Sequence, residues 1–101
     1  MKPIFEWDEE KAKANFRKHK ISFKEAETVF DDPLAITIPD PNHSTSEHRF
    51  IDVGQSEKGR IVVVSYTQRR KATRLISARR ATHAERQKYE HIIQATGVKP
   101  D

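Results

Sequence analysis

A β-strand pattern that runs directly into a helix start constrains the fold of this chain more than any other feature. From Thr73 to Arg80, apolar residues stand among polar neighbours in the alternation of a half-buried strand. Thr82, followed three residues later by Glu85, forms a capping box, the usual mark of a helix N-terminus. The sequence therefore predicts a strand joined to a helix without a linker, with Arg79 and Arg80 at the junction.

This predicted junction offers two kinds of group to an anion. The first backbone N–H groups of a helix lack partners within the helix, and the helix dipole adds partial positive charge there. Arg79 and Arg80 add planar guanidinium groups, which bind phosphate through paired hydrogen bonds. We therefore expect the junction to bind phosphate.

Strand geometry separates the two arginines. In a regular strand, the odd-numbered residues from 73 to 79 share one face and the even-numbered residues from 74 to 80 share the other. Arg79 and Arg80 then point apart, and the small Ser77 leaves room for a ligand beside Arg79. The alternative for Arg79 is an ion pair, either with Glu85 or with a carboxylate of the first half of the chain.

Positive charge is concentrated in one part of the chain. The 101 residues carry a formal net charge of +4. Positions 60–88 hold nine basic residues and one acidic residue, a net of +8, whereas positions 1–59 hold nine basic and twelve acidic residues, a net of −3. This asymmetry favours a surface for a polyanion such as RNA on one side of the molecule. The residues expected to bind RNA are Arg60, Arg69, Arg70, Lys71 and Arg86.

Two helices are predicted before the strands begin. Asp8 is a good N-cap for a helix that runs to about residue 18 or 19. Ser22 and Glu25 form a second capping box, and Pro33 ends the helix that it starts. The short apolar segment 4–7 is interpreted either as a small edge strand or as a plug under the first helix.

Alternating residues and turn signals then predict strands over about 34–39, 48–54 and 60–67, before the strand that ends at Arg80. Short turns between consecutive strands make neighbours antiparallel. The predicted fold is α+β, with two N-terminal helices, a four-stranded antiparallel sheet and a C-terminal helix. The length predicts one domain over residues 1–101, with a frayed tail from about residue 96.

Composition narrows the classes of function. No segment approaches the roughly 20 apolar residues of a membrane helix, and the N-terminus lacks an apolar signal region, so a cytoplasmic location without membrane contact is predicted. Cysteine is absent, which excludes disulfides, thiolate metal ligands and cysteine nucleophiles. The five histidines show no familiar ligand spacing, and no metal site or cofactor is predicted.

The candidates for acid–base chemistry each have an ordinary structural interpretation. Glu85 is either a general base or simply the capping residue, and Tyr89 either stacks a base or lies in the core with a polar tip. His83, His43 and His48 have suitable side chains for proton transfer. If the substrate is RNA, the expected reaction is attack by the ribose 2′-OH on the adjacent phosphodiester, with arginines opposing the developing charge.

Three blocks, in order along the chain, resemble the BrnT family. They are Phe5-x-Trp7-Asp8-x-x-Lys11-x-x-x-Asn15-x-x-Lys18-His19-x-Ile21-x-Phe23-x-Glu25-Ala26, Phe30-Asp31-Asp32-Pro33, and Ile76-Ser77-Ala78-Arg79-Arg80-Ala81-Thr82 with Glu85 and Tyr89. The similarity extends from Phe5 to about Glu90. One departure is Lys20, where the family often has glycine at a helix end.

The resemblance implies a ribonuclease toxin of a bacterial type II toxin–antitoxin module, with a fold similar to the RelE toxins. It implies a metal-independent endoribonuclease that inhibits translation and is neutralised by a BrnA-type antitoxin. The antitoxin would carry the DNA-binding element, so that the complex represses its own operon. A homodimer or a heterotetramer is the expected assembly. Arg79 carries over as catalytic, with Arg74, Arg80, Glu85 and Tyr89 as further candidates.

Two other functions fit the same residues. A non-catalytic nucleic-acid-binding or regulatory module would use the arginines only to contact phosphates, with a steep dependence of binding on salt. A protein-interaction domain would dock the basic face on an acidic partner.

Overall fold

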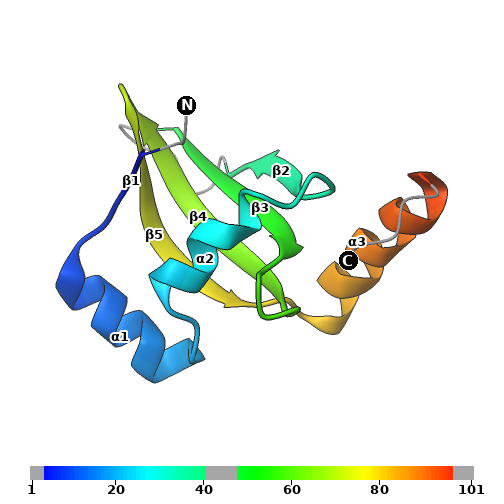
Figure 1. The fold of residues 1–101 in the computed structure, drawn as a ribbon, viewed down its shortest axis with the longest axis horizontal. Helices are drawn as coiled ribbons and strands as arrows, with labels where there is room; N and C mark the ends of the chain where they lie inside the picture. Colours follow the sequence, from blue (N-terminus) through cyan, green and yellow to red (C-terminus); the bar gives the residue numbers. More distant parts are fainter. Residues whose placement is uncertain (1–3, 41–47, 97–101) are drawn as a thin grey trace.

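The computed structural model describes residues 4–40 and 48–96, which form one twisted sheet and three helices (Figure 1). The strands are β1 (Ile4–Glu6), β2 (Ile36–Pro39), β3 (Arg49–Gln55), β4 (Ile61–Arg69) and β5 (Ala72–Arg80). The helices are α1 (Glu9–His19), α2 (Phe23–Val29) and α3 (His83–Thr96). The predicted frayed tail and most of the predicted loop before β3 lie outside the described residues.

The predicted four-stranded antiparallel sheet is wrong, because the described residues form a five-stranded mixed sheet in the order β1-β5-β4-β3-β2. The additional strand, β1, pairs in parallel with residues 72–74 of β5. Three residues are too few to show alternation, and a parallel partner about 70 positions away leaves no local turn signal. This architecture does not establish the expected likeness to RelE toxins.

Helices α1 and α2 lie over one face of the sheet (Figure 1). Asp8 caps α1 by accepting hydrogen bonds from the backbone N–H groups of Glu10 and Lys11, at 2.8 and 3.1 Å. Ser22 caps α2 in the same way through the N–H of Glu25, at 3.0 Å. The main core lies between these helices and strands β4 and β5. Its fully buried members are Ile21, Phe23, Ala26, Val29, Val62, Val64, Tyr66, Leu75 and Ala78.

Asn15 fixes α1 to β5. Because β1 pairs with only the first three residues of β5, the edge of β5 beyond it has no neighbouring strand. The buried amide of Asn15 takes that place: it donates to the C=O of Ala78 at 2.8 Å and accepts from the N–H of Ala78 at 3.1 Å. The same amide nitrogen donates to the C=O of Ile21 at 3.0 Å, so one side chain joins α1, the segment before α2 and β5.

A bulge in β5 changes which side chains share a face. Ser65 of β4 pairs with Ser77, but the next residue pairs with Leu75, so Ile76 is an extra residue in β5. The predicted regular alternation is therefore wrong. Leu75 lies in the core together with Ala78, and Arg74 moves to the face that carries Ser77 and Arg79.

The C-terminal helix α3 packs on the face opposite α1 and α2. The ring of Tyr89 is buried there against Val53 and Val63. The Tyr89 hydroxyl donates to the carboxylate of Asp32, which also accepts from the backbone N–H groups of Leu34 and Gln55, at 2.9 and 2.8 Å. One carboxylate thus holds α3, β3 and the segment after α2 together. None of the described helices is long and apolar enough to cross a membrane.

Replacing Asn15 with alanine tests its role as the link between α1 and β5. We expect Asn15→Ala to lower the free energy of unfolding by about 2–4 kcal/mol, because three buried backbone groups lose their partner. Urea denaturation should show a lower midpoint with a similar slope. Lys18→Ala, an exposed substitution on the same helix, should change stability by less than about 0.5 kcal/mol. Equal stability of Asn15→Ala and the wild type would contradict this role.

Candidate nucleic-acid interface

The junction between β5 and α3 has the local structure expected from the capping box. Only two residues separate Arg80, the last of β5, from His83, the first of α3. The hydroxyl of Thr82 accepts from the N–H of Glu85 at 3.2 Å, and the carboxylate of Glu85 accepts from the N–H of Thr82 at 2.8 Å. These reciprocal bonds set the direction in which the helix leaves the strand.

Arg79 forms a two-pronged ion pair with Glu85. Its Nη1 and Nη2 atoms lie 2.8 and 2.9 Å from the two carboxylate oxygens. The Arg79 guanidinium holds the pKa of Glu85 down to about 2, although partial burial opposes this shift. Glu85 is therefore ionised at neutral pH and is a weak proton acceptor there.

Arg79 keeps part of its hydrogen-bonding capacity. Its guanidinium has five N–H donors, and three of them bond to Glu85 and to the C=O of Arg80. These bonds use both protons of Nη1 and one proton of Nη2. The remaining Nε and Nη2 protons lie along one edge of the guanidinium, which is the geometry that binds a phosphate through two parallel hydrogen bonds. The Arg79 side chain is 39% exposed, so a ligand has access to it.

Arg80 lies on the other face of β5, because it pairs with Val62 of the main core whereas Arg79 pairs with Val63 beneath α3. It borders a polar hollow of about 370 Å³, called the junction hollow below. The residues lining the junction hollow are Gly59, Arg60, Ile61, Arg80, Ala81 and Arg86. Within the described residues, the guanidinium of Arg80 has no hydrogen-bond or ion-pair partner.

The two other arginines of the junction hollow are partly engaged. Arg60 donates through Nε, at 2.9 Å, and through Nη2 to the carboxylate of Glu25, and Nη2 also donates to the C=O of Lys20 at 3.3 Å. Arg86 donates through Nε to Glu90 at 3.1 Å, in an exposed pair one helical turn apart. Three guanidiniums therefore line one hollow, and two of them each pair with one carboxylate, whereas Arg80 has no such partner among the described residues.

Arg74 lies on the same face as Arg79, at the β1 side of the sheet. It forms an ion pair with Glu6, its register partner in β1, at 3.0 Å. Ser77 lies between the two arginines along β5. The bulge therefore brings Arg74 and Arg79 to one face, where regular alternation would have separated them.

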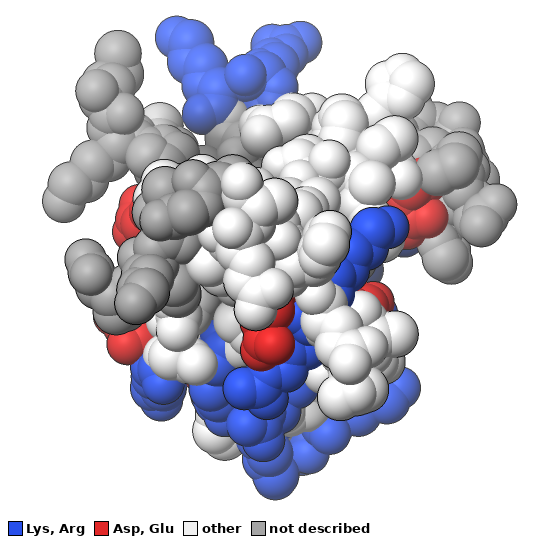
Figure 2. All heavy atoms as spheres, turned by 90° about the vertical axis from the view of Figure 1, so that its right-hand side faces the viewer, with Lys and Arg blue, Asp and Glu red and all other residues white. Residues whose placement is uncertain are grey.

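The structure divides the predicted RNA-binding residues into two groups. One group, Arg60 and Arg86, lines the junction hollow. The other group, Arg69, Arg70 and Lys71, lies at the β4–β5 turn, where Arg70 has a left-handed φ of 43°. The nine residues of β5 separate this turn from the junction by roughly 25 Å, at about 3.3 Å per residue. Figure 2 shows basic side chains gathered at the top and, in a larger group, at the bottom of the molecule.

Tyr89 and the histidines occupy different environments. The Tyr89 side chain is 1% exposed, and burial together with the bond to Asp32 raises its pKa. The structure therefore gives Tyr89 a role in packing α3, and its catalytic role stays a prediction. His83 and His48 are exposed, whereas His43 lies outside the described residues.

Sequence reasoning missed the partner of Arg60. The sequence pattern assigns Glu25 only to a capping box, but its carboxylate is 1% exposed and binds Arg60 and the hydroxyl of Ser56, the latter at 2.7 Å. Burial by itself raises the pKa of Glu25, but the bonds from Arg60 and Ser56 outweigh it and lower the pKa. The available signal was an acidic residue on the apolar face of α2, directly before Ala26.

Three comparisons with known proteins place the chain. A family model described as the ribonuclease toxin BrnT of type II toxin–antitoxin systems matches residues 7–85. A crystal structure of the Brucella abortus ribonuclease toxin BrnT superposes with a TM-score of 0.64 at 24% sequence identity, covering 81% of this chain and all of that one. At this identity the superposition shows a shared fold. No curated protein matches.

Residues 4–40 and 48–96 contain no group of three or more side chains that could together hold a metal ion.

The pairing of Glu85 with Arg79 predicts a pH-dependent loss of stability. Because the pKa of Glu85 is lower in the folded state than the ordinary value of 4.5, the pair stabilises the fold above about pH 4.5. That contribution should disappear as the pH falls towards about 2. Urea midpoints measured across this range should converge for the wild type and Glu85→Gln. Glu90→Gln, which removes an exposed pair, serves as the control, and a difference for Glu85→Gln that persists at pH 2 would contradict the prediction.

Proposed function

The chain belongs to the BrnT family of ribonuclease toxins of type II toxin–antitoxin systems, and from this premise we propose that it is a metal-independent endoribonuclease that inhibits translation. The placement of two arginines supports this proposal most directly. At the end of β5, Arg79 keeps one two-proton edge of its guanidinium, and Arg80 on the opposite face borders the junction hollow without a partner among the described residues. Both arrangements suit phosphates of a nucleic-acid backbone.

The proposed reaction is an internal transfer within RNA. The 2′-oxygen of one ribose forms a bond to the adjacent phosphorus, and the bond from that phosphorus to the 5′-oxygen of the next nucleotide breaks. The 2′-OH loses its proton and the leaving 5′-oxygen gains one, so the products are a 2′,3′-cyclic phosphate and a 5′-hydroxyl. Negative charge grows on the phosphoryl oxygens during this step, and positioned guanidiniums lower its energy.

The residues would divide this work by position. Arg79 contacts the reacting phosphate through its Nε–Nη2 edge, while Glu85 holds the guanidinium in place from the other side. Arg80 binds a neighbouring phosphate at the junction hollow, together with Arg60 and Arg86. Arg74 lies on the face of Arg79 and extends its positive surface.

The basic residues of the β4–β5 turn lie too far from Arg79 to touch the same phosphate, so we assign Arg69, Arg70 and Lys71 to flanking RNA. Of the predicted catalytic residues, Tyr89 has the least access to RNA, and we assign it to the placement of α3.

Membership of a type II family implies an antitoxin partner. We propose that the partner is a BrnA-type antitoxin, which neutralises the toxin and recruits it to operator DNA, so that the complex represses its own operon. RNA cleavage of this kind would take place in the cytoplasm. A homodimer of toxin, or a heterotetramer with antitoxin, is the assembly that we expect.

Replacing Arg79 tests the proposed chemistry. We expect Arg79→Ala to slow cleavage of RNA at least about 100-fold, because a charge stabiliser of the transition state is lost. Arg79→Lys should also be strongly impaired, since an ammonium cannot pair with Glu85 and phosphate along two edges. Wild-type cleavage should persist in EDTA, stop on RNA with 2′-O-methyl groups, and leave cyclic phosphate ends.

Two controls accompany this test. The double variant Arg79→Ala/Glu85→Gln removes the carboxylate that Arg79→Ala would leave unpaired, and it should unfold cooperatively. Lys88→Ala, an exposed cation on α3, should retain cleavage. Full activity of Arg79→Ala would remove it from the catalytic residues, and RNA binding without cleavage by the wild type would assign the chain to a non-catalytic module.

Arg80 is expected to act through charge. With a non-cleavable 2′-O-methyl RNA, Arg80→Ala should weaken binding and reduce the slope of log K against log salt by about one unit, because one phosphate contact is lost. Lys71→Ala at the far end of β5 should have a smaller effect on short RNA than on long RNA. Fluorescence anisotropy at several salt concentrations measures both, and an unchanged slope for Arg80→Ala would exclude the contact.

A further inference from the structure

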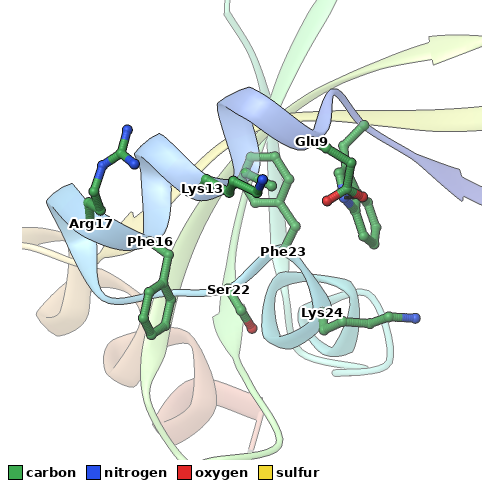
Figure 3. Close-up of a pocket in the computed structure, with 9 residues that line it drawn as sticks. Glu9, Lys13, Phe16, Arg17, Ser22, Phe23 and Lys24 are labelled. Carbon is green, nitrogen blue, oxygen red and sulfur yellow. Dashed lines mark hydrogen bonds between the residues drawn. The ribbon is translucent and has the colours of Figure 1, made fainter.

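The two N-terminal helices leave a groove between them that the ribonuclease site does not use. The hollow, called the α1–α2 groove below, has a volume of about 590 Å³. Figure 3 shows Phe16 of α1 projecting beside Ser22 and Phe23 of α2 pointing between the two helices, while Arg17 and Lys24 extend outward. The residues lining it are Trp7, Glu9, Ala12, Lys13, Phe16, Arg17, Ser22, Phe23 and Lys24.

The inner surface of the groove is apolar and aromatic. Trp7 meets Phe23 edge to face, with ring centroids 5.8 Å apart. The small Ala12 also lines the groove and packs against the main core. Phe16 is 49% exposed and does not belong to the main core, although it is one of the largest apolar side chains of α1. Exposed aromatic surface beside a hollow is typical of a protein-binding site.

The rim of the groove is positively charged. Lys13, Arg17 and Lys24 lie around it, and Lys24 extends over the ring of Trp7 at 5.9 Å. Among the described lining residues, Glu9 is the one carboxylate, and it accepts a hydrogen bond from the indole N–H of Trp7 at 3.0 Å. The groove thus combines an apolar floor with three cations and suits an occupant that has one apolar face and acidic flanks.

We propose that the α1–α2 groove binds an acidic amphipathic segment of the antitoxin, which inserts a large apolar side chain against Phe16, Trp7 and Phe23. A groove between two helices accepts an amphipathic helix in this way. This inference rests on the proposed function, because it names the surface through which the antitoxin recognises the toxin.

The end of the groove lies near the junction hollow, which links docking to neutralisation. The C=O of Phe16 accepts from the N–H of Lys20 at 2.9 Å, where α1 ends. The C=O of Lys20 in turn accepts from Nη2 of Arg60, at 3.3 Å, and Arg60 lines the junction hollow. A bound helix advances about 5.4 Å per turn, so a segment that continues past the end of α1 reaches these arginines. Its carboxylates then occupy the position of RNA phosphates.

RNA is the competing occupant of this groove, because bases stack on aromatic rings. The charges at the start of α1 favour a protein. Glu9 lines the groove and Glu10 lies next to it, and RNA, which carries a phosphate at every nucleotide, could not avoid them. A protein segment can instead place its apolar side chain beside Glu9 and its carboxylates beside Arg17 and Lys24. The side chain of Lys13 lies 4.0 Å from Glu10, which partly offsets the positive charge at that end for either occupant.

The test measures antitoxin binding and RNA cleavage separately. The probe is the purified protein encoded by the reading frame beside the toxin gene, and calorimetry gives its affinity for purified toxin variants. Phe16→Asp should weaken binding roughly 30-fold or more, as for a buried aromatic contact. RNA cleavage without antitoxin should stay within about twofold of the wild type. Ile38→Asp is the matched control, since Ile38 is 44% exposed and lies outside the groove; it should leave both properties unchanged.

A second variant keeps the test independent of the folding of Phe16→Asp. Reversing two rim charges in Lys13→Glu/Lys24→Glu should weaken antitoxin binding and make it less sensitive to salt. Unchanged affinity in both variants, or no binding by the wild type, overturns the proposal. Loss of RNA cleavage with unchanged antitoxin affinity assigns the groove to RNA instead. Failure of cleavage in every sample would count against the ribonuclease activity alone, because the affinities do not depend on it.

Discussion

The contact between Asn15 and the backbone of Ala78 is the link on which the placement of the site depends. Strand β1 is too short to cover the edge of β5, so an amide from α1 completes the hydrogen bonds of that edge. The same amide holds the C=O of Ile21, which begins the segment leading to α2. Because buried backbone groups left without partners are costly, this one side chain fixes both helices against the strand that carries Arg79.

The bulge at Ile76 then determines how charge is distributed around that strand. Because of the bulge, Leu75 and Ala78 both lie in the main core, and Arg74 lies on the same face as Arg79, whereas a regular strand would place each pair on opposite faces. Core packing is the physical cause, since both apolar side chains gain burial only if the alternation is interrupted. The result is an arginine face on one side of β5 and the junction hollow, with Arg80, on the other.

The arginines also differ in how well their partners can be predicted. Glu85 lies six residues from Arg79, within the same strand–helix unit, and an ion pair between them is one of two interpretations that the sequence allows. Glu25 lies 35 residues from Arg60, and their pair exists only because α2 packs over the β3–β4 turn. No periodicity or spacing connects such residues, so the charge pattern by itself counts Arg60 as a free cation. The α1–α2 groove could not be predicted from the sequence either. Phe16 has the helical spacing of a core residue, but in the structure it is half exposed.

Local chemistry determined the elements of this protein from the sequence alone. Capping residues set the helix starts at Asp8, Ser22 and Thr82, and alternation with turns set the antiparallel strands β2 to β5. The residue blocks around Asp8, Asp32 and Arg79 were also sufficient to indicate the family. Only the tertiary structure decided the parallel position of β1, the bulge, and which carboxylate each arginine binds. These features arise from contacts between residues far apart in the chain, where packing and hydrogen-bond satisfaction outweigh local preference.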